Sequence, residues 1–350
     1  MKKSILYTIK LGGENEKVHH IKNLIDSILI KSFFENFEIH VHYEDNINTD
    51  VHSYLENIHE KKIIIFKYKK ISWHKWLKKS FNETKNFDYL ITLHADCYFT
   101  SKHFDKEIIN QIIDVDNLGV FTLLDESYKT QFLYPQLRSG FFIDQIIEQT
   151  RRFATFAEYR FQKKNWHVFN VRLKKLLNLI KIPEGYNTKL FNKFSMLDLD
   201  KMNFPSKRIK THGIYTHLMG FKLTNIKYFN DITDFDVSHG LYADEDICNL
   251  SLKKDLINLF IPSATFVHDR PGLGQTRSGD LINADSKKIS NIFLNKWGFL
   301  PSEWMTTDNY SEPIPIKKSE EIIRKIENKH GKNLTWTKNY NSYDWKNFYI

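Results

Sequence analysis

The sequence has little cysteine and no long apolar run, and each absence excludes a class of protein. Two cysteines, Cys97 and Cys248, cannot build a disulfide framework or a zinc site made of cysteines, so a reducing cytoplasm is the simplest expectation. No stretch approaches the roughly 18 uninterrupted apolar residues of a membrane span. The start, "MKKSILYTIKLGG", lacks a long apolar core and a small-residue cleavage site, so we interpret it as a first strand, not a signal peptide.

The remaining composition is that of an ordinary globular protein. Hydrophobic residues make up 41% and charged residues 27% of the 350 residues. This length suits one large α/β domain with an insert, or two domains. We find no internal repeat and no low-complexity tract.

The positive charge is concentrated in one segment. Residues 151–210 contain 15 lysines and arginines against 4 acidic residues, which is +11. Because the whole chain has a net charge of +9, the remainder sums to −2. A basic segment is therefore set into a nearly neutral protein.

The first half of the chain alternates strand-like and helix-like patterns. The apolar residues of 17–34 recur at helical spacing, and similar segments separate the later expected strands from one another. This βαβ rhythm predicts an α/β fold with a mostly parallel sheet and helices on both faces, whose function lies at the carboxyl ends of strands. The expected strands are 4–12, 37–43, 62–68, 89–95 and 118–125.

This rhythm stops after the fifth expected strand and resumes near residue 211. The intervening segment reads as two basic, aromatic-rich helices followed by a polar loop, so we interpret it as an insert. A further helix is expected over 318–329. The chain therefore divides into 1–126, a basic helical insert over 127–210, 211–300, and a C-terminal helical extension over 301–350.

The first candidate site lies in "LITLHADCYF", where an apolar strand ends in His94 and Asp96. A carboxylate at the carboxyl end of a parallel strand lies where ligands bind, and hard divalent cations prefer carboxylate oxygens. The structural alternative is an aspartate that caps the following helix.

The second candidate is the acidic run Asp244-Glu245-Asp246, just before an apolar helical pattern. A carboxylate there could act as a general base toward an attacking hydroxyl group, and repulsion among the acids would raise at least one pKa. The structural alternative is a favourable interaction of the acids with the helix dipole.

Two further candidates also follow expected strands. His268 ends "ATFVHD" and could bind a metal, while Arg270 and Arg277 in the following glycine-rich loop could bind phosphate oxygens. Glu44 and Asp45 in "HYEDN" could bind a ribose or the edge of a base. The alternatives are a half-buried histidine, a solvated basic loop and an Asp-Asn turn.

The order and spacing of these pieces resemble an inverting family-2-type glycosyltransferase with the GT-A fold. The resemblance covers about residues 1–126 and 211–300. His94 occupies the position where that family usually has the first acid of its DxD motif, so a metal site would depend on Asp96. The resemblance is carried by "LITLHADCYF", "HGIYTHLMGFKL", "YADEDICNLSLKK", "LFIPSATFVHD" and "FLNKWG".

The resemblance implies a metal-dependent transfer of a sugar from a nucleotide diphosphate sugar to a hydroxyl group of a glycan or lipid-linked acceptor. Residues 1–126 would bind the nucleotide sugar, and residues 211–300 would form the acceptor and catalytic half. The pathway expected by analogy is surface polysaccharide or lipooligosaccharide synthesis. The chain would be cytoplasmic, with peripheral contact to the inner face of the membrane.

The resemblance also implies roles for the candidate residues. Mn²⁺ or Mg²⁺ would bind Asp96 and His268. The general base would be Asp246, then Glu245, with Asp244 third because the register of the motif is uncertain by one residue. The donor-binding residues would be Glu44, Asp45, His94, Asp96, Arg270 and Arg277.

Other functions remain open from the sequence. The basic, aromatic-rich segment 151–210 could bind an anionic membrane surface, form a solvated helical subdomain, or bind nucleic acid. Binding to nucleic acid would explain none of the acidic motifs. A nucleotidyltransferase would also use strand-end carboxylates, but it usually has a glycine-rich loop after the first strand. "KLGGENEK" over 10–17 is only a thin version of such a loop.

Overall fold

The computed structural model describes the sheet, its helices and one C-terminal helix. The described residues are 3–11, 16–125, 208–211, 218–235, 243–268, 279–300 and 316–331. The predicted basic helices of the insert lie outside these ranges, as do Arg270 and Arg277.

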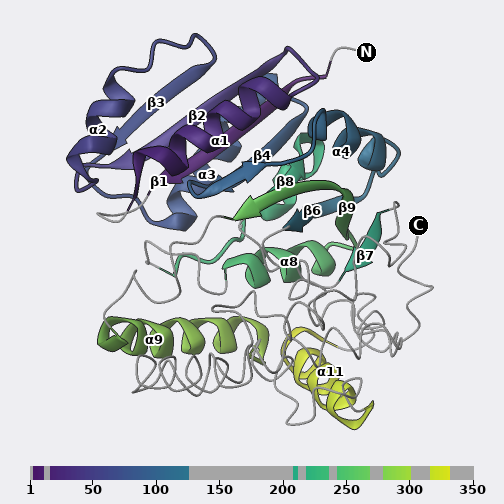
Figure 1. Ribbon diagram of the computed structural model, residues 1–350. Helices are drawn as coiled ribbons and strands as arrows, with labels where there is room; N and C mark the ends of the chain where they lie inside the picture. Colours follow the sequence, from purple (N-terminus) through teal and green to yellow (C-terminus); the bar gives the residue numbers. More distant parts are fainter. Residues whose placement is uncertain are drawn as a thin grey trace, which may run out of the picture.

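The first half of the chain forms six strands with helices between most of them (Figure 1). Residues 118–125 form a strand with the predicted bounds, and the other predicted strands are recovered to within about one residue. The elements are β1 (Ile5–Leu11), α1 (Val18–Lys31), β2 (Phe37–Glu44), α2 (Thr49–Glu56), β3 (Ile63–Tyr68), α3 (Trp73–Glu83), η1 (Thr84–Asn86), β4 (Tyr89–His94), β5 (Cys97–Phe99), α4 (Phe104–Ile112) and β6 (Leu118–Asp125).

The second half adds three strands and further helices to the same molecule. A helix was predicted over 318–329, and α11 confirms it. The elements are β7 (Ile209–Thr211), β8 (Leu218–Lys222), η4 (Leu223–Phe229), α8 (Ala243–Lys253), β9 (Ile257–His268), α9 (Gly279–Trp297) and α11 (Ile316–His330).

The strands of the described residues form one mixed sheet of nine strands in the order β3-β2-β1-β4-β8-β6-β9-β5, with β7 also paired to β9. Strands β1, β2, β3, β4, β6 and β9 run in one direction, and β5, β7 and β8 run against them. The predicted α/β fold with a mostly parallel sheet is confirmed. The antiparallel β8 between β4 and β6 joins the two halves of the chain.

The side chains of β1 show how the sheet separates two apolar layers. All seven residues of β1 are buried, as expected for a central parallel strand that is covered on both faces. Ile5, Tyr7 and Ile9 pack with α1, α2 and α4, whereas Leu6 packs with α3, α8, α9 and α11. The molecule is therefore a three-layer arrangement with a core on each side of the sheet.

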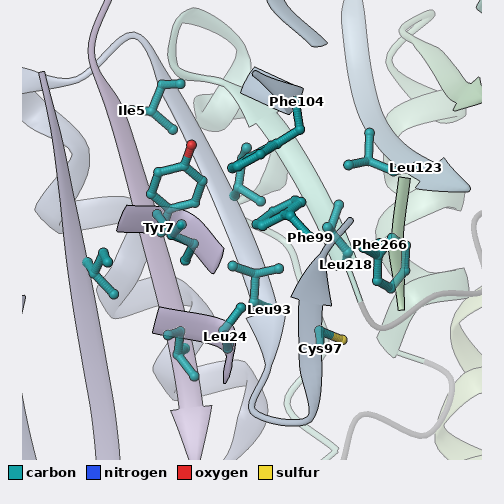
Figure 2. Close-up of a cluster of buried hydrophobic side chains, with 14 of the residues drawn as sticks. Ile5, Tyr7, Leu24, Leu93, Cys97, Phe99, Phe104, Leu123, Leu218 and Phe266 are labelled. Atoms are coloured by element: carbon teal, nitrogen blue, oxygen red, sulfur yellow. The ribbon is translucent and has the colours of Figure 1, made fainter. Parts of the chain in front are cut away.

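Aromatic side chains fill the core between the sheet and α4. Figure 2 shows Tyr7, Phe99 and Phe104 pointing into the same interior, with Phe266 of β9 nearby. The rings of Phe99 and Phe104 stack with their centroids 3.5 Å apart. This packing holds the three-residue strand β5, for which the sequence contained no periodic signal, against the sheet.

Capping side chains begin two helices, and a glycine ends another. Ser72 Oγ accepts a hydrogen bond from Lys75 N at 3.3 Å at the start of α3, and Asn48 Oδ1 accepts one from Asp50 N at 2.8 Å at the start of α2. Gly298 follows α9 with φ of +83°, a left-handed conformation that favours glycine. The glycine of "FLNKWG" therefore stops α9 immediately after Trp297.

No helix in the described parts of the chain is both long and apolar enough to cross a membrane.

Candidate functional site

The first part of the candidate site is the turn between β4 and β5. Apolar residues 90, 91 and 93 bury β4 in the sheet, and the strand then ends with an exposed His94. Ala95 is buried, Asp96 is half-buried, and β5 begins at Cys97. The sequence thus places a solvent-accessible imidazole and carboxylate at the carboxyl end of a central strand.

Strand β9 reaches this same turn from a distant part of the chain. Cys97 is paired directly with His268 in the antiparallel ladder between β5 and β9. Directly paired residues have Cα atoms about 5.5 Å apart or less, so the backbone of His268 lies next to that of Asp96. Thr100 Oγ1 and Thr265 Oγ1 are hydrogen-bonded at 2.6 Å and hold the other end of the short ladder.

The acids after β2 have different surroundings. Glu44 is buried, and its Oε1 lies 3.4 Å from Lys10 Nζ and accepts a hydrogen bond from Ile71 N at 3.2 Å. Burial lowers the pKa of Lys10, and the neighbouring Glu44 opposes this shift. Asp45 is exposed, with its Oδ1 3.6 Å from Lys67 Nζ. Only Asp45 faces solvent, where a ligand could reach it.

The acidic run occupies the first turn of α8, as predicted. Asp244 and Glu245 are half-buried, whereas Asp246 is completely buried. Helix α8 is followed after a short turn by β9, and Asn258 Nδ2 donates to Cys248 O at 3.3 Å. The helix therefore runs antiparallel to β9, and its acidic first turn is directed toward the carboxyl ends of β6 and β9.

Asp246 is held by four interactions with residues of two other segments. Its Oδ2 accepts a hydrogen bond from Thr233 N at 2.8 Å, and its Oδ1 accepts one from Thr233 Oγ1 at 3.0 Å. Oδ1 also accepts from Trp297 Nε1 at 2.8 Å and lies 2.8 Å from Lys296 Nζ. Burial lowers the pKa of Lys296, and the charge of Asp246 opposes that shift. The carboxylate of Asp246 is therefore fully engaged inside the protein.

Glu245 is the acid of this turn whose proton affinity is changed most clearly. Burial raises the pKa of Glu245 to about 7, a hydrogen bond from its own backbone amide lowers it, and the negative charge of Asp246 raises it further. A carboxyl group with a pKa near neutrality can both accept and release a proton under ordinary conditions.

The structure brings some predicted residues together and leaves others without description. Asp96 and His268 lie at one turn, although the side chain of His268 is outside the described residues, as are Arg270 and Arg277. Sequence reasoning missed Thr233, Lys296 and Trp297 as partners of the acidic run. The motif "FLNKWG" was the signal that could have pointed to Lys296 and Trp297.

Comparison with known sequences identifies no relative of this chain. No protein-family model matches it. No curated protein matches it either.

Comparison with solved structures finds similar folds. One is GalNAc-T7 with UDP, GalNAc and Mn²⁺, which is 12% identical with a TM-score of 0.52, over 84% of this chain and 49% of that chain. Another is the mannosyltransferase PcManGT from Pyrobaculum calidifontis with GDP-Man and Mn²⁺, which is 10% identical with a TM-score of 0.44, over 78% of this chain and 59% of that chain. A third is S. aureus TarS, which is 15% identical with a TM-score of 0.29, over 35% of this chain and 22% of that chain. The two weaker likenesses carry no conclusion.

The likeness to GalNAc-T7 shows the fold alone. It confirms the expected GT-A-like arrangement of a mostly parallel sheet flanked by helices. This chain covers about half of that structure, 49%, so the likeness does not extend to the whole of the larger protein.

Proposed function

We propose that this protein is a glycosyltransferase that moves a sugar from a nucleotide diphosphate sugar to a hydroxyl group of an acceptor. The observation that carries the proposal is the pairing of Cys97 with His268, because it brings the backbone of His268 from a distant segment to the turn that carries Asp96. The likeness in fold to GalNAc-T7, whose structure contains UDP, GalNAc and Mn²⁺, supports this class of substrate and cofactor.

Asp96 and His268 are the residues that we propose hold Mn²⁺ or Mg²⁺. The carboxylate of Asp96 is half-buried at the turn, and the backbone of His268 lies beside it, so one oxygen and one nitrogen ligand are available there. When bound, the cation would stabilise the negative charge that develops on the leaving diphosphate. Phosphate and water would supply the remaining ligands.

Glu245 is the residue that we propose removes the proton from the acceptor hydroxyl. Its pKa of about 7 and its partial exposure suit a general base at neutral pH. The sequence placed Asp246 first, but its burial and four interactions favour a positioning role that fixes the first turn of α8. Asp244, half-buried one residue earlier, is the third candidate.

The other donor contacts follow from exposure and charge. Asp45 and His94, both exposed, are proposed to contact the nucleoside or sugar, whereas the buried Glu44 would act through its pair with Lys10. Arg270 and Arg277 are proposed to bind the diphosphate, because guanidinium groups match phosphate oxygens in a bidentate way.

A single displacement with Glu245 as base would invert the anomeric centre. We propose a glycan or lipid-linked acceptor and a role in surface polysaccharide or lipooligosaccharide synthesis, by analogy with the family that the sequence resembles. Residues 151–210, with their charge of +11, are proposed to contact an anionic membrane surface from the cytoplasmic side.

The proposal is tested by measuring nucleoside diphosphate release from UDP-, GDP- and dTDP-sugars with Mn²⁺. Asp96→Ala should lower the release by on the order of 100-fold or more, because the cation loses its carboxylate ligand. The matched control is Asp116→Ala, an exposed aspartate just before the amino end of β6. That variant should keep the wild-type rate and the wild-type circular dichroism spectrum.

Two outcomes would contradict the proposal. Release that is unchanged in Asp96→Ala would exclude this residue as a metal ligand. Formation of a nucleoside triphosphate and a sugar 1-phosphate when pyrophosphate is added, instead of a nucleoside diphosphate, would identify a nucleotidyltransferase.

A further inference from the structure

Strand β2 has one apolar face and one polar face, and both are largely covered. Phe37, Ile39, Val41 and Tyr43 face the core formed with α1 and α2. Because side chains alternate along a strand, the intervening residues point toward α3 on the other side of the sheet. These are Glu38, His40, His42 and Glu44, of which the last three are buried.

Two histidines of this polar face meet a glutamate at the end of α3. His40 Nδ1 lies 3.0 Å from Glu83 Oε2, and His42 Nε2 lies 3.6 Å from the same oxygen. Among the described residues these three side chains form the one group that has ligand atoms all within 4.8 Å of one another. Ligand atoms at 2.0–2.1 Å from a tetrahedral zinc ion are about 3.3 Å apart, a value between the 3.0 and 3.6 Å that separate Glu83 Oε2 from the two nitrogens.

The inner nitrogen of His42 has no hydrogen-bond partner. His42 is completely buried, and its Nε2 is unsatisfied. A buried polar atom without a partner carries a free-energy cost that a metal ion would remove. An imidazole nitrogen is among the commonest metal ligands in proteins.

Neighbouring groups already orient both rings. His42 Nδ1 lies 3.1 Å from Tyr68 Oη, and its ring stacks on Phe66 with centroids 4.7 Å apart. His40 Nε2 lies 3.0 Å from Glu38 Oε2. Metal-binding histidines usually make such a contact through their second nitrogen, because it fixes the tautomer and the ring orientation.

We propose that His40, His42 and Glu83 form a binding site for Zn²⁺ between β2 and α3. The ligands would be His40 Nδ1, His42 Nε2 and Glu83 Oε2, with water in the remaining tetrahedral position. The site cross-links the C-terminal end of α3 to the sheet. It is separate from Asp96 and does not depend on the proposed sugar transfer.

The local charges are compatible with a divalent cation. Glu83 and Glu38 contribute two negative charges, and the nearby Lys79 contributes one positive charge, with its Nζ 4.6 Å from the centre of the Tyr68 ring. Without a metal, His40 would balance the two glutamates as a protonated imidazolium. The experiment must therefore distinguish a zinc site from an ion pair.

The test measures zinc bound to the full-length protein after dialysis, by elemental analysis and by titration with Zn²⁺ and Co²⁺. The Asp96→Ala background removes the other proposed metal site. His42→Phe keeps the stacked ring but removes one ligand, and Glu83→Gln removes another. The control is His52→Gln, a histidine of α2 paired with Glu56 at 3.3 Å on the opposite face of the sheet.

The proposal expects one equivalent of Zn²⁺, visible Co²⁺ absorption bands of a tetrahedral site, and a higher melting temperature with zinc. His42→Phe and Glu83→Gln should weaken zinc binding by on the order of 100-fold or more, and Glu38→Gln by about 10–100-fold. His52→Gln should bind as the wild type does. Equal binding by His42→Phe and wild type, or no retained zinc and no Co²⁺ bands, would overturn it and leave only the ion pair.

Discussion

Two neighbouring carboxylates of α8 have different environments because successive helical residues point about 100° apart. Asp246 points into the protein and accepts hydrogen bonds from Thr233 and Trp297. Glu245 is half-buried and has a pKa raised to about 7 by burial. One residue of rotation along the helix thus separates a structural carboxylate from a proposed base.

The proposed base predicts a pH-dependent activity. Because the carboxylate form of Glu245 accepts the proton, kcat/KM should rise as the pH increases through about 7. Glu245→Gln should lower kcat by about 10²–10⁴-fold and remove this dependence, as measured in steady-state assays from pH 5 to 9. Glu107→Gln is the matched control, since Glu107 is also half-buried in the first turn of a helix.

The same shift affects stability with a defined sign. The pKa of Glu245 in the folded protein lies above its ordinary value of 4.5. The contribution of Glu245 to the stability of the fold is therefore complete below pH 4.5 and is lost as the pH rises through about 7. The difference corresponds to about 3 kcal/mol at most.

A Glu245→Gln variant that retains wild-type activity and its pH profile would exclude Glu245 as the base.

At this scale the residue types could be predicted, but the burial of each could not. The sequence placed three acids at a helix start, and α8 begins with them. Which acid is buried depends on Thr233, which precedes α8, and on Trp297 at the end of α9. Local periodicity contains no information on those contacts, so Asp246 was preferred over Glu245.

At the scale of elements, Asp246 connects three segments. It belongs to α8, and its partners are Thr233 after η4 and Lys296 and Trp297 at the end of α9. Figure 1 shows α8 between the sheet and α9. The contact therefore fixes α9 and the segment after η4 to the helix that carries the proposed base.

Loss of this contact should destabilise the fold. Asp246→Asn keeps the size of the side chain but removes the charge that three donors share at Oδ1, so the free energy of unfolding should fall by about 3 kcal/mol. Urea denaturation followed by tryptophan fluorescence measures the change. Asp116→Asn should leave the midpoint unchanged, because its pair with Lys222 at 3.3 Å is exposed. An equal midpoint for both variants would exclude this role.

Most elements could be predicted from local patterns, and the exceptions have physical reasons. The strand at 118–125 was recovered because it is a short, nearly continuous apolar run, and the helix near 318–329 because its apolar residues recur at helical spacing. Strand β5 has three residues, too few for any period to show. Its place beside His268 results from pairing with β9, which no local pattern encodes.

At the scale of the whole molecule, the charge is separated from the proposed catalytic parts. The described sheet carries the candidate site. Residues 151–210 have a charge of +11, and the rest of the chain has −2, so that the net charge is +9. A strongly basic segment attracts an anionic surface through its charge.

The charge predicts that the protein floats with vesicles that contain phosphatidylserine but not with phosphatidylcholine alone, and less so at high salt. Replacing Arg172, Lys174 and Lys175 with glutamine should weaken binding by about 100-fold, because each basic residue near the surface contributes about 1 kcal/mol. Replacing Lys61, Lys69 and Lys70 removes the same charge elsewhere and should have little effect. Equal loss in both variants would contradict the prediction, and binding to RNA instead would favour the nucleic-acid alternative.

Local patterns along the chain were enough to predict the α/β class, most strands and helices, and the residue types at strand and helix ends, because each depends on neighbours within a few positions. Long-range pairing alone decided that the backbone of His268 lies beside the turn of Asp96, that β8 joins the two halves, and that Asp246 is fully buried while Glu245 is half-buried. It also decided that His40 and His42 meet Glu83. Burial and contact depend on segments distant in the chain, and only the folded protein brings these segments together.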